Sequence, residues 1–267
     1  RKERPHRRLV VVGEPDLGAR TCQGICESGS ILEAHARGRR ILPANRIPRK
    51  TRKSGGMNCD RRPMVPPMRA VALVLLLLTL PLPAAATIYT VAESGGDFTV
   101  VQDALDVAQA GDTVQVHEKP TPYFERLVFP RSGNAGSGHI TLEAAPGEQP
   151  ALDGTGVPGE QFMILIDTKS YLKVIGFEIQ NNLGVTDGSG IRILGSGSHL
   201  EIRNNRIHDM RGQNAMGITV YATEPTAISD LVISGNEVYD SEPATSEAIV
   251  LNGNVDGFVV EDNYVHD

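Results

Sequence analysis

The stretch LEIRNNRIHD at residues 200–209 is repeated further along the chain as LVISGNEVYD at 231–240 and FVVEDNYVHD at 258–267. The copies share two alternating apolar residues, an Asn three positions later, a β-branched residue, a His or Tyr, and a final Asp. The shared asparagines are Asn205, Asn236 and Asn263, which gives periods of 31 and 27 residues. An earlier, degenerate copy is LKVIGFEIQN at 172–181, with Phe177 in place of the Asn. Periods of this length are typical of repeat architectures, so the repeat decides the fold.

A second apolar run lies between the motifs, as GIRIL at 190–194, GITVY at 217–221 and AIVLN at 248–252. Apolar and polar residues alternate in both kinds of run, as in β-strands that bury one face. We therefore predict an all-β fold, a parallel β-helix with three short strands per coil. Equivalent residues of successive coils would lie about 4.8 Å apart in such a solenoid.

The ends of a solenoid need cover, because an open strand edge pairs readily with another chain. A helix is expected at 99–110, and its apolar face is formed by Val101, Ala104, Leu105 and Ala108. We expect this helix to cap the N-terminal end. The third copy of the motif stops at Asp267 without comparable cover, and we expect further coils to be missing after it.

The chain before residue 87 has a different character. Residues 68–86, MRAVALVLLLLTLPLPAAA, have the basic start, apolar run and Ala-x-Ala end of a secretory signal peptide, which predicts an extracellular or periplasmic protein. The apolar run is too short for stable membrane insertion, although an uncleaved or lipid-anchored form is the alternative. Residues 1–67 carry 16 Lys and Arg against 6 Asp and Glu. We interpret them as upstream sequence translated from a misplaced start; a basic nucleic-acid-binding arm is the alternative.

The remaining domain, residues 87–267, is strongly acidic. It holds 9 Lys and Arg against 26 Asp and Glu, a net charge of −17, and it contains no Cys. Such a surface repels nucleic acid and anionic lipid, so we expect neither as a partner. A polyanionic substrate would need bridging cations. We expect the domain to be a monomer.

Three segments carry a family resemblance: TIYTVAESGGDF at 87–98, VQDALDVAQAGDTVQV at 101–116 and HITLEAAPGEQPALDG at 139–154. Together with the Asn-containing coils, they resemble secreted right-handed β-helix proteins of the pectate-lyase-like superfamily. The most similar groups are the polysaccharide lyase families of alginate lyase and chondroitinase B, and the family-nine pectate lyases. The resemblance implies a right-handed β-helix that acts on carbohydrate. It does not specify the reaction, because this superfamily also holds hydrolases, epimerases, tailspikes and adhesins.

Two ladders follow from stacking the motif. Asn205, Asn236 and Asn263 are expected at a sharp corner that needs a positive φ, with their amides hydrogen-bonded along the ladder. The second ladder consists of Asp209, Asp240 and Asp267. Stacked carboxylates repel one another unless a cation lies between them, so this ladder, with Asp187 or Glu247, predicts a Ca²⁺ site. The alternative is that each Asp caps its own turn.

The resemblance places a substrate groove on the outward face of the 190/217/248 strands. If the isoleucines of these runs point inward, one outward row holds Arg192, Thr219 and Val250, and the next holds Leu194, Tyr221 and Asn252. Arg192 is then suited to bind a uronate carboxylate bidentately, and Tyr221 to stack on a sugar ring. Thr219 and Asn252 complete the expected substrate-binding set. Solvent-facing Arg and Tyr are also common on any β-surface, which is the alternative.

A lyase acting on uronates needs a base and a cation that stabilises the enolate. Arg192, His208 and Lys173 are weak candidates for the base. Lys173 alternates with Leu172 and Val174 and so faces outward from a different strand. His208 occupies the same repeat position as Tyr239 and His266, which favours a repeated surface position over a catalytic one.

Three functions remain open. The first is a polysaccharide lyase that cleaves uronate-containing acidic glycans by β-elimination, with Ca²⁺ or Arg neutralising the carboxylates. The second is a non-catalytic glycan-binding or adhesion β-helix. The third is a glycoside hydrolase on the same scaffold, with Asp209/Asp240 or Asp187/Glu247 as its carboxylate pair.

Overall fold

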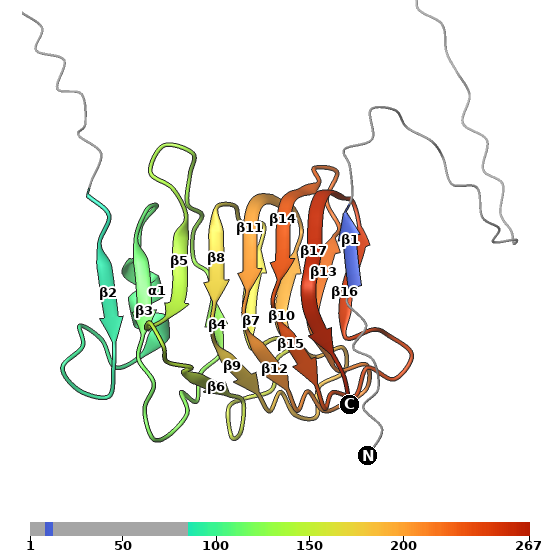
Figure 1. The fold of residues 1–267 in the computed structure, drawn as a ribbon, viewed down its shortest axis with the longest axis horizontal. Helices are drawn as coiled ribbons and strands as arrows, with labels where there is room; N and C mark the ends of the chain where they lie inside the picture. Colours follow the sequence, from blue (N-terminus) through green and yellow to red (C-terminus); the bar gives the residue numbers. More distant parts are fainter. Residues whose placement is uncertain (1–8, 13–84) are drawn as a thin grey trace, which may run out of the picture. The chain divides into compact units, whose positions relative to one another are not determined.

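The computed structural model describes residues 85–267 and the backbone of strand β1 at Leu9–Val12. The expected basic segment at 1–67, apart from β1, and nearly all of the expected signal peptide at 68–86 lie outside the described residues. Residues 87–267 form a parallel β-solenoid (Figure 1). This confirms the all-β, β-helix prediction.

The strands stack into three faces, which we name A, B and C. Face A consists of β2 (Ile88–Val91), β3 (Thr113–Val116), β5 (Ile140–Ala144), β8 (Leu172–Ile175), β11 (Gly197–Arg203), β14 (Ile228–Ser234) and β17 (Val255–Val265). Face B consists of β6 (Ala151–Asp153), β9 (Glu178–Gln180), β12 (Arg206–His208), β15 (Glu237–Tyr239) and the end of β17. Face C consists of β4 (Leu127–Val128), β7 (Ile164–Asp167), β10 (Ser189–Leu194), β13 (Met216–Ala222) and β16 (Ile249–Gly253).

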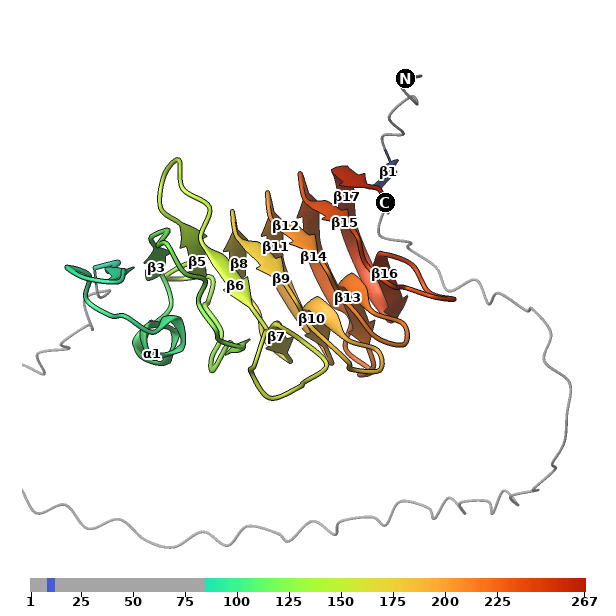
Figure 2. The same cartoon turned by 90° about the horizontal axis from the view of Figure 1, so that it is seen from below.

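All pairings within these faces are parallel, and each of the coils that begin with β5, β8, β11 and β14 adds one strand to each face. Figure 2 shows the coils stacked one behind another along the solenoid axis. The long strand β17 turns the corner between faces A and B, so that these two faces form one continuous sheet. β1 pairs antiparallel with β17.

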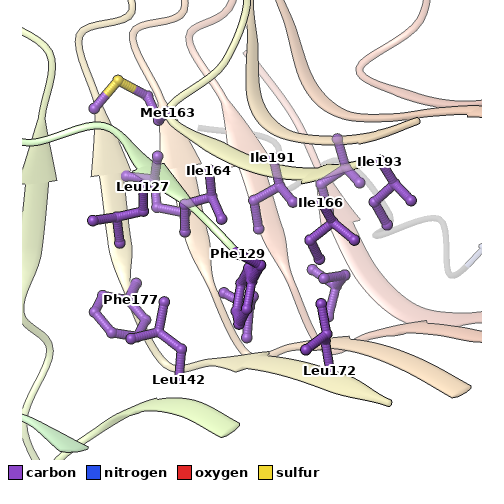
Figure 3. Packing of buried hydrophobic residues seen from close by; sticks show 14 of the residues in the cluster. Leu127, Phe129, Leu142, Met163, Ile164, Ile166, Leu172, Phe177, Ile191 and Ile193 are labelled. Atoms are coloured by element: carbon purple, nitrogen blue, oxygen red, sulfur yellow. The ribbon is translucent and has the colours of Figure 1, made fainter. Parts of the chain in front are cut away.

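The register of the stack follows the repeat. Leu200 pairs with Leu172 and Leu231 on face A, and Ile207 pairs with Ile179 and Val238 on face B. Their side chains point into the interior, where aliphatic and aromatic residues form one buried core (Figure 3). The apolar positions of the motif therefore build the core of every coil, as predicted.

Helix α1 (Val101–Val107) packs against β2, β3 and β4 at the N-terminal end of the solenoid and buries the apolar face predicted for it. It is shorter than the expected 99–110, because its ends are fixed by distant residues. Glu125 accepts the first helical N–H groups, from Val101 at 3.1 Å and Gln102 at 3.0 Å. Arg131 donates to carbonyls of the last turn, including that of Ala108 at 2.6 Å. Within the described residues, no helix has the length and apolar character needed to cross a membrane.

The Asn ladder forms, but its backbone geometry differs from the prediction. The left-handed residue at each corner is the preceding one: Asn204 (φ 55°), Gly235 (φ 69°) and Asp262 (φ 54°). Asn205, Asn236 and Asn263 themselves turn inward and are 2%, 1% and 6% exposed. The amide of Asn205 donates to Oδ1 of Asn236 at 3.0 Å, and the amide of Asn236 donates to Oδ1 of Asn263 at 2.9 Å. The predicted amide ladder is confirmed, whereas the positive φ assigned to these three residues is wrong.

Candidate functional site on face C

The outer surface of face C carries the two predicted rows. Arg192 pairs with Thr219, and Thr219 with Val250; Leu194 pairs with Tyr221, and Tyr221 with Asn252. The alternate residues of these strands are buried, as expected from the alternation: Ile191, Ile193, Ile218 and Val220. The predicted register and orientation of face C are therefore confirmed.

Arg192 is the charged residue at the centre of this surface. Its guanidinium carbon lies 5.0 Å from the centroid of the Tyr221 ring, a cation–π distance, and its Nη1 donates to the carbonyl of Asp187 at 2.7 Å. The side chain is half-buried, and within residues 85–267 it has no carboxylate partner. The ring and the carbonyl hold the guanidinium in one orientation while leaving other N–H groups available to a ligand.

Thr219 requires a correction. It occupies the outward row, but it is 0% exposed, and its hydroxyl lies 2.8 Å from that of Ser189. A side chain that is fully covered cannot touch a substrate, so Thr219 belongs to the support of the surface. Asn252, by contrast, is exposed beside Tyr221, where the prediction placed it.

Two residues of the preceding strand were missed by the sequence analysis. Leu165 pairs with Arg192, and Asp167 pairs with Leu194, so β7 extends both rows by one coil. Asp167 is exposed, and Leu165 is half-buried. The signal in the sequence was the apolar run at 162–166, which lacks the following Asn motif and so was not aligned with the repeat.

Of the acidic residues expected to bind calcium, two form hydrogen bonds with other side chains and two are exposed to solvent. Asp209 lies 2.8 Å from Nδ1 of His208, and it accepts from Arg211 at 2.8 Å. The hydrogen bond with His208 lowers the pKa of Asp209 below its ordinary value. Asp187 accepts from the amide of Asn214 at 3.0 Å, while Asp240 and Glu247 are exposed.

Between residues 85 and 267, no three His, Cys, Asp or Glu side chains form a group that could hold a metal ion. The acidic residues named for it are therefore not gathered into one cluster, and a Ca²⁺ site stays a prediction. The alternative role in turns fits the backbone better, since Asp187, Asp209 and Asp240 all have positive φ values, of 54°, 54° and 44°. The carboxylate of Asp209 nevertheless pairs with His208 and Arg211 as a charged group rather than capping its own turn.

The other two candidate bases lie on different faces. Lys173 is on face A, where its Nζ is 3.0 Å from Glu201. His208 is on face B and 7% exposed, with Nε2 3.1 Å from Glu178 and Nδ1 facing Asp209. Neither residue is brought to Arg192 by the fold.

His208 instead belongs to a stack of rings on face B. Its ring centroid is 4.6 Å from that of Tyr239, which in turn is 5.0 Å from that of His266, with the planes within 17° of each other. The prediction that these three residues share one repeated position is therefore confirmed.

The described residues also enclose a hollow of about 410 Å³ at the N-terminal end, between the loops at 92–96 and 117–120. Its charged lining residues are Glu93, His117, Glu118 and Lys119. None of the predicted site residues lines it.

Comparison with known proteins gives three findings. The family model described as Protein of unknown function (DUF1565) matches residues 131–265. The "Uncharacterized protein YwoF" of Bacillus subtilis (strain 168) is 34% identical over 179 residues, which cover 63% of this chain and 37% of that protein. The chain thus spans little more than a third of the length of this relative. A solved structure named "Rhamnogalacturonan lyase" is similar with a TM-score of 0.46 and 18% identity, over 67% of this chain and 50% of the other.

Proposed function

The chain belongs to the DUF1565 family, and for this member we propose that face C binds a uronate-containing polysaccharide, as part of a carbohydrate-active β-helix protein. The observation that carries the proposal is the guanidinium of Arg192, held over the ring of Tyr221 and, among residues 85–267, without a carboxylate partner. A secreted location, expected from residues 68–86, belongs to the same proposal.

The charge of Arg192 suits it to bind an anion. The domain has a net charge of −17, so the guanidinium of Arg192 provides a local positive charge that attracts the carboxylate of a ligand. The planar guanidinium can donate two parallel hydrogen bonds to a uronate carboxylate. The half-buried side chains of Tyr221 and Leu194 offer apolar contact to the adjoining sugar.

The reaction we propose for such a site is β-elimination. Arg192 would neutralise the substrate carboxylate and so acidify the neighbouring C5–H, and a base would remove that proton. The electron pair would form the C4=C5 double bond as the C4–O glycosidic bond breaks, and the leaving sugar oxygen would take up a proton. The location of Lys173 and His208 in ion pairs on faces A and B favours a second candidate, in which the surface binds the glycan without cleaving it. The third candidate, hydrolysis, gains no support, because the carboxylate of Asp209 is paired with Arg211.

The test uses the full chain with polygalacturonate, alginate and chondroitin sulfate. Retention on immobilised glycan measures binding, and the ultraviolet absorbance of the unsaturated uronate product measures elimination. A charge-assisted hydrogen-bonded pair contributes about 1.5–3 kcal/mol, so Arg192→Ala should weaken binding about 10- to 100-fold. Arg192→Lys should restore part of the affinity, because Lys keeps the charge but not the bidentate geometry.

Lys173→Ala is the matched control, since it removes a cation from a different face, and it should bind like the wild type. Rising absorbance would support the lyase, and retention without absorbance would support binding alone. The proposal would be refuted if none of the glycans is retained and none gives a rise in absorbance. A parallel series with a chelator tests whether a divalent cation bridges the acidic surface and the glycan.

A further inference from the structure

A second feature of the surface lies at the corner between faces C and A. One residue in each coil immediately precedes the inward-facing face A residue of the row Ile140, Leu172, Leu200, Leu231 and Phe258. In successive coils these residues are His139, Tyr171, His199, Asp230 and Gly257. They form a column along the solenoid axis, separate from the rows of face C.

The backbone of this column is left-handed from the second coil on. The φ angles are 56° at Tyr171, 57° at His199, 49° at Asp230 and 65° at Gly257. Asp and Gly adopt this conformation readily, but a bulky residue there costs on the order of 1–3 kcal/mol. Two adjacent coils therefore hold an aromatic ring where the backbone does not favour one.

Ring stacking accounts for part of this cost. The rings of Tyr171 and His199 have centroids 4.2 Å apart and planes within 13°, and His139 packs at 5.6 Å against Tyr171. Stacked aromatic pairs contribute about 0.5–1.5 kcal/mol beyond the area they bury. The stack thus runs over three coils and ends at His199.

The column changes character after His199. The next coil supplies the carboxylate of Asp230, with Oδ2 3.6 Å from Nδ1 of His199, and the coil after that supplies Gly257, which has no side chain. Oδ1 of Asp230 lies 4.0 Å from the point where a Cβ at 257 would stand. The His199 side chain is 42% exposed although Tyr171 covers one ring face, and that of Asp230 is 63% exposed.

An aromatic face beside a carboxylate, with no side chain in the next coil, suits a sugar ring. The C–H face of a pyranose packs on an aromatic ring, and its hydroxyls donate to a carboxylate. Successive coils are about 4.8 Å apart, which leaves room for one ring over the gap at Gly257. Asp230 would repel a uronate at this distance.

We propose that His199, Asp230 and Gly257 form a second glycan-binding site, which takes a neutral hexopyranosyl unit. This site does not depend on face C. It lies around the corner from Tyr221, so the two sites can be tested separately.

Saturation-transfer NMR on the full chain tests the proposal with the methyl glycosides of glucose, galactose and mannose. We expect transfer to the C–H protons of at least one of them, and methyl galacturonoside should show none once Arg192→Ala has removed the face C site. His199→Asn removes the ring while keeping a residue at ease in the left-handed region, and it should abolish the signal. Gly257→Asn should also abolish it, by filling the gap without strain.

Arg192→Ala is the control and should leave this signal unchanged, which separates failure here from failure of the face C proposal. Thermal unfolding of each variant confirms that it remains folded. The proposal is overturned if His199→Asn retains the wild-type signal, if none of the three neutral glycosides shows transfer, or if, with Arg192→Ala, the uronoside shows as much transfer as they do.

Discussion

The Asn ladder makes a quantitative prediction for Asn236→Ala, since this residue sits at the middle of the ladder. Oδ1 of Asn236 accepts two hydrogen bonds from Asn205, one from its backbone N–H and one from its side-chain amide, each at 3.0 Å. The amide of Asn236 donates to the carbonyl of Ile202 and to Oδ1 of Asn263, each at 2.9 Å. All of these atoms are buried.

The magnitude follows from the groups left without partners. Alanine removes the acceptor of two buried donors on Asn205, and each unsatisfied buried donor costs about 1–3 kcal/mol, so the free energy of unfolding should fall by about 2–6 kcal/mol. Oδ1 of Asn263 keeps the backbone N–H of Asn236 and adds little to this loss. For a domain of this size, the thermal midpoint should fall by roughly 5–20 °C.

Calorimetry and amide hydrogen exchange measure the effect on the full chain. The backbone N–H of Asn205 loses its acceptor directly, so its exchange should accelerate more than that of the rest of the solenoid. The matched control is Asn252→Ala, at an exposed Asn on face C, which should change stability by less than about 0.5 kcal/mol. If Asn236→Ala is no more destabilising than Asn252→Ala, the ladder does not hold the coils together as argued.

Two further predictions concern charge and packing. The hydrogen bond from His208 lowers the pKa of Asp209 in the folded state, so its ionised form favours folding above the unfolded-state pKa of about 3.9, and this contribution disappears as the pH falls through the folded-state pKa. Asp209→Asn should therefore reduce stability at neutral pH and flatten the acid limb of a stability–pH curve; an unchanged curve would contradict the shift. Gly217→Ala should destabilise by about 1–3 kcal/mol in urea unfolding, because its Cβ would stand 2.5 Å from Val238 in the core, whereas Gly136→Ala, at an exposed loop, should unfold like the wild type.

The inward-facing side chains and the pairing of the coils could be predicted from the sequence, because both depend on local periodicity. The alternation in each motif places Leu200 and Ile202 inward, and the recurrence of the Asn sets which residues of neighbouring coils pair. A shift of one residue would turn every apolar side chain outward, so the register has one stable solution. The ladder and the paired rows of face C follow from the same argument.

The errors arose where a distant residue decides the local conformation. The corner needs a left-handed residue, and both Asn204 and Asn205 are compatible with it. Asn204 takes that conformation because Asn205 is needed inside, where it bonds the neighbouring coils. The helix begins at Val101 because Glu125, 24 residues later, accepts its N–H. Neither partner is visible in a local pattern.

The environment of the outward-facing side chains was also hard to predict from local sequence. That environment explains why Arg192 is the residue of interest. Alternation predicts that a side chain leaves the core, but it does not predict what covers it, and so Thr219 and His208 were both expected at the surface although both are buried. Acidic residues outnumber basic ones almost threefold in 87–267, so a cation on a strand readily meets a carboxylate. Lys173 and Arg206 pair with carboxylates of the neighbouring coil, and Arg203 pairs with Glu201 of its own strand. Arg192 lies among the strand cations of this surface but pairs with a carbonyl and an aromatic ring, and a carboxylate supplied by a ligand would complete its coordination.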